Sequence, residues 1–167
     1  MDNVIANTLD ALERNGIRTA YMGSTIAARR KILELIPKGS TVGVGDSVTV
    51  RQLDVLDALQ ESGRVLVNLF SKEISLAATK GEIGRSRRRA ICDLTLACEF
   101  FLTGTNAVTQ DGKLVNTDGS GNRVAGMIFG PRKVIVVIGK NKIVKNADEA
   151  LYRIRNIIAP QHAKTKK

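Results

Sequence analysis

Residues 100–139 read FFLTGTNAVTQDGKLVNTDGSGNRVAGMIFGPRKVIVVIG, and their pattern indicates the fold class of this chain. It begins with FFLTGT and ends with VIVVIG, two short apolar runs without polar alternation. Such runs are typical of parallel strands that are covered on both faces. Between them, AVTQDGKLVN places two extended arms around Asp111 and Gly112, which is a strong β-hairpin signal, and GNRVAGMIFG predicts a short helix of small residues.

Helical and extended patterns alternate through the rest of the chain. Apolar residues at helical spacing, capping residues and glycine stops set the expected boundaries. In chain order we expect a helix over 3–14, a strand over 17–22, a helix that Ser24 caps, a strand over 41–46, a helix from Thr49 to near Gly63, a strand over 64–70, a helical stretch between 71 and 99 interrupted at Gly81 and Gly84, and a last helix before Pro160.

This order predicts an α/β fold. The expected architecture is a doubly wound, mostly parallel sheet with helices on both faces and an inserted β-hairpin. In such sheets, ligands bind where loops leave the carboxyl ends of the strands. Loops that follow strands are therefore the candidate sites.

The length of 167 residues fits one domain. We expect a single α/β domain over 1–160 and a basic C-terminal tail over 161–167. The sequence holds no run of about 18 apolar residues that could span a bilayer. Its N-terminus has early acids and amphipathic spacing in place of a secretory signal, so the sequence predicts a cytoplasmic protein.

Cysteine and histidine are scarce. Cys92 and Cys98 lie six residues apart in one predicted helix, so their thiols would point to different faces and would not share a metal ion. The sole histidine, His162, lies in the basic tail, which disfavours a histidine-based triad or metal site. The sequence also has no P-loop motif. We therefore predict no metal site and no cofactor.

The net charge of +10 raises the hypothesis of a nucleic-acid partner. Aromatic residues make up 4% of the chain, and no basic run is interleaved with aromatics on which bases could stack. This composition favours a solvated basic face and tail over nucleic-acid binding. Most of the excess charge lies in two clusters, which consist of Arg85, Arg87, Arg88 and Arg89, and of Lys164, Lys166 and Lys167.

The first candidate loop is GVGDSVT, residues 43–49. Gly43 and Gly45 allow the backbone to approach a ligand, and Asp46 and Ser47 precede a helix whose first N–H groups favour an anion. A dinucleotide fingerprint would require glycine at position 48, which is Val48. The loop therefore indicates anion binding without indicating a nicotinamide cofactor.

Two further loops follow predicted strands. In TGTNA, Thr105 and Asn106 offer hydrogen-bonding groups, although an Asx-type turn that satisfies its own backbone is an equal alternative. In the third loop, glycines permit positive φ, polar residues can cap the next helix, and an arginine suits a carboxylate or phosphate. This loop consists of Asp118, Gly119, Ser120, Gly121, Asn122 and Arg123. Asp118 could bond to neighbouring amides, hold Arg123, or act as an acid or base.

The run from FFLTGTNAV to GKNKIV, with GSTVGVGDSVT upstream, resembles the LUD-domain family, named for lactate utilisation. The TGTNA, DG, LVN-DG-GNR, GP and VIVV-GKNKIV elements come in the family's order and spacing, and the resemblance extends from the first helix to NIIAPQHAK. It implies a fold similar to sugar-phosphate isomerases and CoA-transferases. It also implies a bacterial or archaeal protein linked to the oxidation of lactate to pyruvate, with a ligand-binding role for the three loops.

The sequence departs from the family in one respect. Members of this short type often continue beyond the point that corresponds to Lys167 into a cysteine-containing tail, and larger relatives carry iron–sulfur motifs; neither feature is found here. Electron transfer is therefore not assigned to the chain. The expected partners are a small anionic metabolite and, through the resemblance, iron–sulfur protein subunits, while a homo-oligomer is left open.

Three functional hypotheses follow from the sequence. The first is a LUD protein without redox centres that binds a 2-hydroxy or 2-oxo acid, or a similar anion, at the three loops. The second is an isomerase or an acyl- or CoA-transferase in which a carboxylate does the chemistry, with Asp118 or Glu99 as the candidates. Glu73 also lies near a predicted sheet edge, although solvation on a helix surface is the simpler interpretation for both glutamates. The third is an assembly or nucleic-acid-binding role for RSRRR and the KTKK tail.

Overall fold

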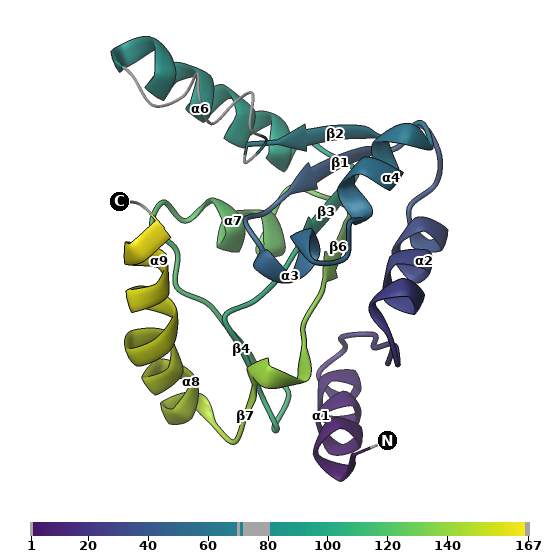
Figure 1. Ribbon diagram of the computed structural model, residues 1–167, viewed down its shortest axis with the longest axis vertical. Coiled ribbons are helices and arrows are strands. Elements are labelled where there is room, and N and C mark those ends of the chain that lie inside the picture. Colours follow the sequence, from purple (N-terminus) through teal and green to yellow (C-terminus); the bar gives the residue numbers. More distant parts are fainter. Residues whose placement is uncertain (1, 70, 72–80, 166–167) are drawn as a thin grey trace. The chain divides into compact units, whose positions relative to one another are not determined.

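The structure, a computed structural model, describes residues 2–69, 71 and 81–165. The chain divides into two compact units, and each is described by itself. Unit 1 consists of Met1–Tyr21, Thr105–Thr117 and Ile138–Lys167, and unit 2 consists of Met22–Gly104 and Asp118–Val137. Figure 1 labels most of the elements of both. The expected single domain over 1–160 with a tail over 161–167 stays a prediction.

A four-stranded parallel sheet forms the centre of unit 2. Its strand order is β2-β1-β3-β6, and every neighbouring pair is parallel. The four strands are β1 (Thr41–Val44), β2 (Val65–Asn68), β3 (Phe100–Thr103) and β6 (Lys133–Val136). Each lies inside or overlaps a segment that the sequence predicted as a strand, so the α/β prediction with a parallel sheet is confirmed.

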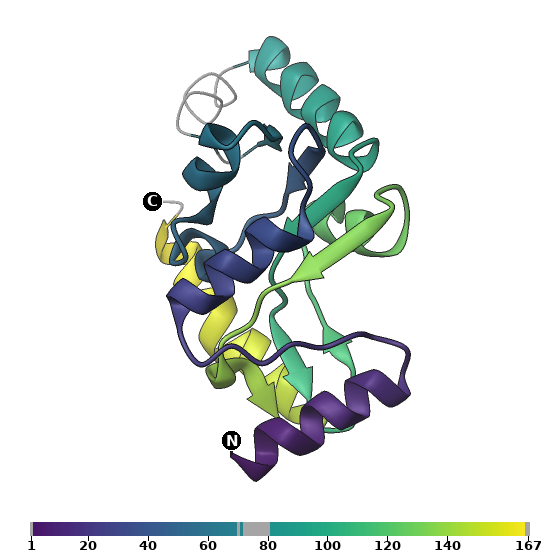
Figure 2. The same cartoon turned by 90° about the vertical axis from the view of Figure 1, so that its right-hand side faces the viewer.

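Helices cover both faces of this sheet (Figure 2). Phe100 and Leu102 of β3 belong to one buried cluster with residues of the helices on the first face, while the ring of Phe101 lies against Gly126 on the other. Side chains that alternate between two covered faces explain why the strand reads as a continuous apolar run. The first face carries α2 (Thr25–Leu35), α3 (Val48–Arg51) and α4 (Val55–Glu61), and the other carries α6 (Gly81–Leu96) and α7 (Asn122–Ile128).

The edge strand β6 differs from the prediction. VIVVIG was expected to be buried on both faces, but Val134 is 36% exposed and Lys133 is exposed. Within this sheet, full burial is found in the two central strands, where β3 is buried throughout and β1 over Val42–Val44. A strand at the edge of a sheet has one neighbour, so aliphatic composition alone does not place it in the centre.

The predicted helix from Thr49 to Gly63 is wrong in its boundaries. Ser47, and not Thr49, caps the first turn, and the chain breaks before α4 at Asp54, whose φ of 48° is left-handed. Leu53 and Val55 are both buried. Two residues apart on a continuous helix would point about 200° apart, so the break allows both side chains to reach the core.

Unit 1 holds the predicted hairpin. Strand β4 (Ala107–Thr109) pairs antiparallel with β5 (Leu114–Val115) and parallel with β7 (Ile143–Val144). The turn is held by α1 (Asn3–Arg14), because the Asn15 side chain that follows it donates to the carbonyl oxygens of Asp111 and Gly112 at 3.2 and 3.0 Å. Gly112 adopts a φ of 84°, which favours glycine.

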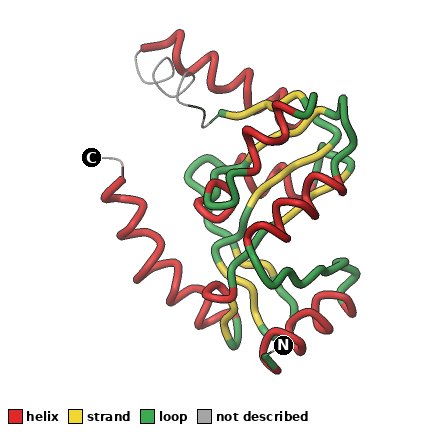
Figure 3. The backbone as a smooth tube through the Cα atoms, turned by 45° about the vertical axis from the view of Figure 1, so that its right-hand side comes forward, coloured by secondary structure: helices red, strands yellow, loops and turns green. Residues whose placement is uncertain are grey.

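A long helical run ends unit 1 (Figure 3). After the 3₁₀ turn Lys140–Lys142 come α8 (Ala147–Arg153), a π-helical turn (Ile154–Ile158) and α9 (Ala159–Thr165). The predicted stop before Pro160 is therefore wrong. Pro160 has no N–H to donate and follows directly on the π-helical turn, which ends where the Ala159 N–H donates to the Ile154 carbonyl five residues earlier.

Three other expectations are corrected. Residues 17–22 form no strand: Ile17 and Tyr21 are 38% and 51% exposed, so the segment has no buried face to pair. Gly84 lies within α6 without interrupting it, since one glycine costs a helix only about 1 kcal/mol. Cys98 lies beyond the end of α6 and does not share a helix with Cys92. Within the described ranges, no helix is long and apolar enough to cross a membrane.

Candidate functional site

The carboxyl edge of the sheet in unit 2 is the candidate site. From β1 the chain moves to β2 on one side, and β3 then lies on the other side of β1. This reversal creates a topological switch point between β1 and β3, the usual position of ligands in doubly wound sheets. The loop at residues 45–47 leaves β1 there, and Gly104 leaves β3 beside it.

Glycines in these segments allow close packing. A Cβ atom on Gly43 would lie 2.7 Å from Thr95 Cγ2, and one on Gly45 would lie 2.8 Å from Thr103 Cβ. A Cβ atom on Gly104 would collide with the Ser47 side chain, whose Cβ it would meet at 3.2 Å. The loops after β1 and β3 are thus in direct contact. The sequence predicted that Gly43 and Gly45 let the backbone approach a ligand; the structure gives them a packing role, and the ligand role stays a prediction.

The polar residues of the first loop are engaged at the start of α3. Ser47 is 7% exposed, and its Oγ accepts a hydrogen bond from the Val50 N–H at 3.2 Å, so it caps the helix. The Asp46 carboxylate accepts from Arg51 Nη1 at 2.5 Å, and the side chains of this pair are 41% and 51% exposed. Arg51 therefore presents a charged group to solvent beside the loop.

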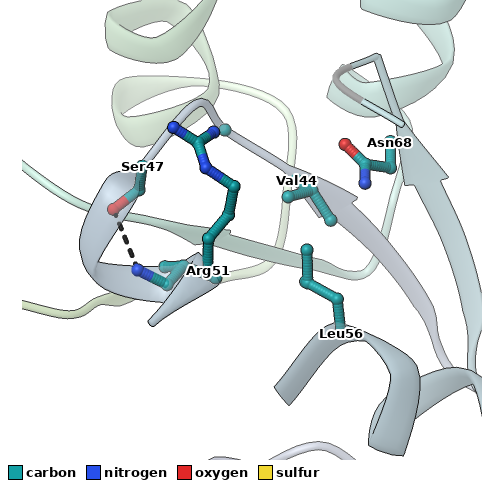
Figure 4. A pocket seen from close by; sticks show the side chains of 7 residues that line it. Val44, Ser47, Arg51, Leu56 and Asn68 are labelled. Carbon is teal, nitrogen blue, oxygen red and sulfur yellow. Dashed lines mark hydrogen bonds between the residues drawn. The ribbon is translucent and has the colours of Figure 1, made fainter. Parts of the chain in front are cut away.

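A small pocket of about 40 Å³ opens next to this loop. Figure 4 shows the Arg51 side chain rising beside Ser47, with Val44 and Leu56 between Arg51 and Asn68. Sequence reasoning missed Arg51 and Asn68. The available signals were an arginine in the first turn after a glycine loop and a polar residue ending an apolar strand. The lining residues are Val44, Gly45, Ser47, Val50, Arg51, Leu56 and Asn68.

In the third loop, Asp118 and Arg123 bind each other. Arg123 Nε donates to Asp118 Oδ1 at 2.8 Å and Nη2 at 2.5 Å, while Asp118 Oδ2 accepts from the Val124 N–H at 2.8 Å. The side chains are 7% and 15% exposed for Asp118 and Arg123. Of the roles considered for Asp118, the structure shows that it holds Arg123 and bonds to a neighbouring amide.

The rest of this loop forms the turn into α7. Gly121 has a φ of 75° at the N-cap position, and Ser120 Oγ donates to Asn122 Oδ1 at 2.9 Å. A Cβ atom on Gly119 would meet no atom within 4 Å. Gly126 of α7 lies against Phe101, and Gly130 beyond its end lies against Leu96, which precedes β3. The start of α7 therefore lies towards the carboxyl edge of the sheet.

The TGTNA loop closes the base of the hairpin in unit 1. Thr105 Oγ1 donates to Asn116 Oδ1 at 3.1 Å, and Asn106 Oδ1 accepts from the Thr117 N–H at 2.8 Å. Thr105 and Asn106 are 2% and 8% exposed. These bonds run to residues 11 positions away and not to the loop's own backbone, as an Asx-type turn would require, and ligand binding by the two side chains stays a prediction.

Glu99, a candidate carboxylate, lies at the opposite edge of the sheet from the pocket. Its Oε2 accepts from the N–H of Thr41 at 3.2 Å, and these residues stand at the amino ends of β3 and β1. Four residues of strand span about 13 Å, so Glu99 is separated from the carboxyl edge by the length of the sheet. Glu73 lies outside the described residues. Nearby, burial raises the pKa of the Cys98 thiol, and the charge of Glu99 raises it further.

The structure thus groups the predicted residues into three sets. In unit 2, Gly45 contacts Thr103 and Ser47 contacts Gly104, while Gly43 packs against Thr95. Asp46 pairs with Arg51, and Asp118 pairs with Arg123. In unit 1, Thr105 and Asn106 meet the end of the hairpin. Each set is described on its own unit.

Comparison with known proteins identifies the family. The LUD-domain profile matches residues 5–167, essentially the whole chain, so this protein belongs to the LUD-domain family. The family is associated with lactate utilisation. Comparisons with curated proteins and with solved structures gave no significant match.

Proposed function

We propose that this LUD-domain protein binds a small anionic metabolite, such as a 2-hydroxy or 2-oxo acid, at the carboxyl edge of the sheet in unit 2, and that it serves lactate utilisation through this binding. The proposed ligand groups are the backbone of Gly45–Ser47, the Arg51 guanidinium and the Asn68 amide. Gly43 supports this loop from within the sheet.

One observation carries the proposal: the pocket beside the loop after β1 has an arginine in its lining. Arg51 is 51% exposed, and one of its guanidinium nitrogens bonds to Asp46. The other nitrogens of the planar group are further donors for a carboxylate. A single water needs about 10–15 Å³ of such a cavity, so the pocket suits a group the size of a carboxylate. The position also agrees with the usual ligand site of doubly wound sheets.

Arg123, which the sequence favoured as the anion-binding cation, has a different part in this proposal. Its charge is already balanced by Asp118, and the two side chains are largely buried. We assign it to fixing the turn before α7. Removal of Arg123 would therefore test folding more than ligand binding.

Isothermal titration calorimetry of the whole chain with lactate, pyruvate, a sugar phosphate and CoA tests the proposal. We expect at least one of these anions to bind, and Arg51→Gln to weaken that binding about tenfold, since a charge-assisted hydrogen bond contributes roughly 1.5 kcal/mol or more. Arg30→Gln is the matched control, because Arg30 is an exposed arginine of α2 in the same unit. Equal affinities for both variants, or no heat with any anion, would remove the basis of the proposal.

For an isomerase or transferase activity we find no specific support in the geometry. Asp118 is paired and Glu99 lies at the wrong edge for chemistry at the pocket. For a nucleic-acid role, Arg85, Arg87, Arg88 and Arg89 are exposed on α6, and Arg89 pairs with Asp93. Such pairs are common on solvated helices, so this role stays a prediction.

A further inference from the structure

Two cations of unit 1 converge on the TGTNA loop. Lys142 Nζ donates to the Thr105 carbonyl oxygen at 2.9 Å, and Arg153 Nε donates to the Asn106 carbonyl oxygen at 3.3 Å. The accepting carbonyls belong to consecutive residues, so the two cationic groups lie beside the same short stretch of backbone. They come from positions 37 and 47 residues further along the chain.

Irregular helical turns hold both cations in place. Lys142 ends the 3₁₀ turn Lys140–Lys142. Arg153 directly precedes the π-helical turn, in which the Ala159 N–H donates to the Ile154 carbonyl. Single π turns inside α-helices occur frequently at functional sites, because the extra residue redirects side chains. Here Arg153 is half-buried and reaches the loop while its neighbour Ile154, 6% exposed, stays in the core.

The charge of Arg153 is not balanced by an acid. Among the described residues, no salt bridge includes it. Its Nε is spent on Asn106, and its two terminal nitrogens form the planar fork that suits a carboxylate or phosphate. Both side chains are half-buried, so an anion that reaches them would interact with positive charges that are partly shielded from water.

We propose that Lys142 and Arg153 form an anion-binding site in unit 1 that takes the carboxylate or phosphate group of a small metabolite. The side chains of Thr105 and Asn106 form hydrogen bonds at the base of the hairpin. Their carbonyl groups position the two cations, and the cations bind the anion. The site consists of unit 1 residues alone and does not depend on the Arg51 pocket.

NMR titration of the ¹⁵N-labelled whole chain tests this site, with inorganic phosphate, lactate and pyruvate as separate probes and sodium chloride as the ionic-strength control. We expect saturable shifts at the backbone amides of 105–107 and 142. Lys142→Gln or Arg153→Gln should weaken binding about tenfold. Lys140→Gln and Arg155→Gln are matched controls, since both residues are exposed neighbours, and they should leave the affinity unchanged. Saturation by phosphate alone would identify a phosphate site, and saturation by lactate or pyruvate a carboxylate site.

If a glutamine variant fails to fold, which a loss of chemical-shift dispersion in its NMR spectrum would show, a conservative variant replaces it. Arg153→Lys keeps the charge and removes the planar fork, so binding should weaken several-fold and persist. Arg51→Gln should leave the unit 1 shifts unchanged, which separates this site from the proposed function. The absence of saturable shifts with all three anions would overturn the inference, and so would equal affinities for Arg153→Gln and Arg155→Gln.

Discussion

The pair formed by Asp118 and Arg123 should stabilise the fold strongly. Asp118→Asn removes the negative charge that is paired with Arg123, whose side chain is 15% exposed. Breaking a largely buried ion pair in this way typically costs 3–5 kcal/mol. Because Arg123 keeps some contact with water, we expect about 3 kcal/mol, equivalent to a fall in melting temperature of about 6–12 °C for a chain of this size.

The exposed pair of Asp46 and Arg51 provides the control. Its side chains are 41% and 51% exposed, so Asp46→Asn should cost about 0–1 kcal/mol. Urea unfolding followed by circular dichroism measures both variants. The double variant Asp118→Asn/Arg123→Gln should cost about 1–3 kcal/mol less than the sum of its single changes, because the two side chains are coupled. Asp118→Asn costing no more than Asp46→Asn, or strictly additive single changes, would refute the burial argument.

Other features give sharper tests of individual contacts. Gly112→Ala should destabilise the chain by about 2 kcal/mol or more, because Gly112 has a φ of 84° and a Cβ atom there would lie 2.6 Å from the backbone of Ala11. Gly23→Ala should cost little, because a Cβ atom on Gly23 would meet no atom within 4 Å. Equal urea unfolding midpoints for the two variants would contradict this. Arg64→Gln should cost about 2–3 kcal/mol in urea unfolding, because the buried guanidinium bonds to carbonyls at the end of α2 at 2.5, 2.7 and 3.0 Å; a cost near zero would mean that water replaces it. Burial raises the pKa of the Cys98 thiol, so stability from the neutral thiol is full below about pH 9 and is lost as pH rises through the raised pKa. Mass spectrometry after iodoacetamide treatment of the folded chain at pH 8 should find Cys98 unmodified, and rapid alkylation there would contradict its burial.

The strands were predictable from sequence because parallel strands need apolar side chains on both faces. FFLT and TVGV form central strands as expected, and the Asp111-Gly112 signal marks the hairpin. IRTAYM also contains β-favouring residues, but Ile17 and Tyr21 remain exposed. Strand propensity depends on a partner and a buried face, and a single sequence does not show whether the fold supplies them.

The site was predictable in its position and less so in its residues. Gly45 and Ser47 were expected at the carboxyl edge and border the pocket. The signal for Arg51, an arginine in the first turn after a glycine loop, is weak by itself, because only the folded chain shows that Arg51 lines the pocket. Arg123 was favoured for an anion because the local sequence could not show that Asp118, five residues earlier, would pair with it in a largely buried site.

Lys142 and Arg153 illustrate the same limit at longer range. Their bonds to the TGTNA carbonyls require β7 beside β4 and a π turn after α8. Neither helical periodicity nor a short motif predicts such a turn. Lys142 and Arg153 lie 37 and 47 residues along the chain from the carbonyls that they bond, so these contacts are seen only in the folded chain.

A crystal structure of the whole chain with the acid that binds most tightly in calorimetry would show whether a small anion binds beside the loop after β1. We expect the carboxylate within hydrogen-bond distance of the Arg51 guanidinium and next to Gly45–Ser47. Well-ordered density for the acid elsewhere, with Arg51 bonded to Asp46 alone, would contradict it.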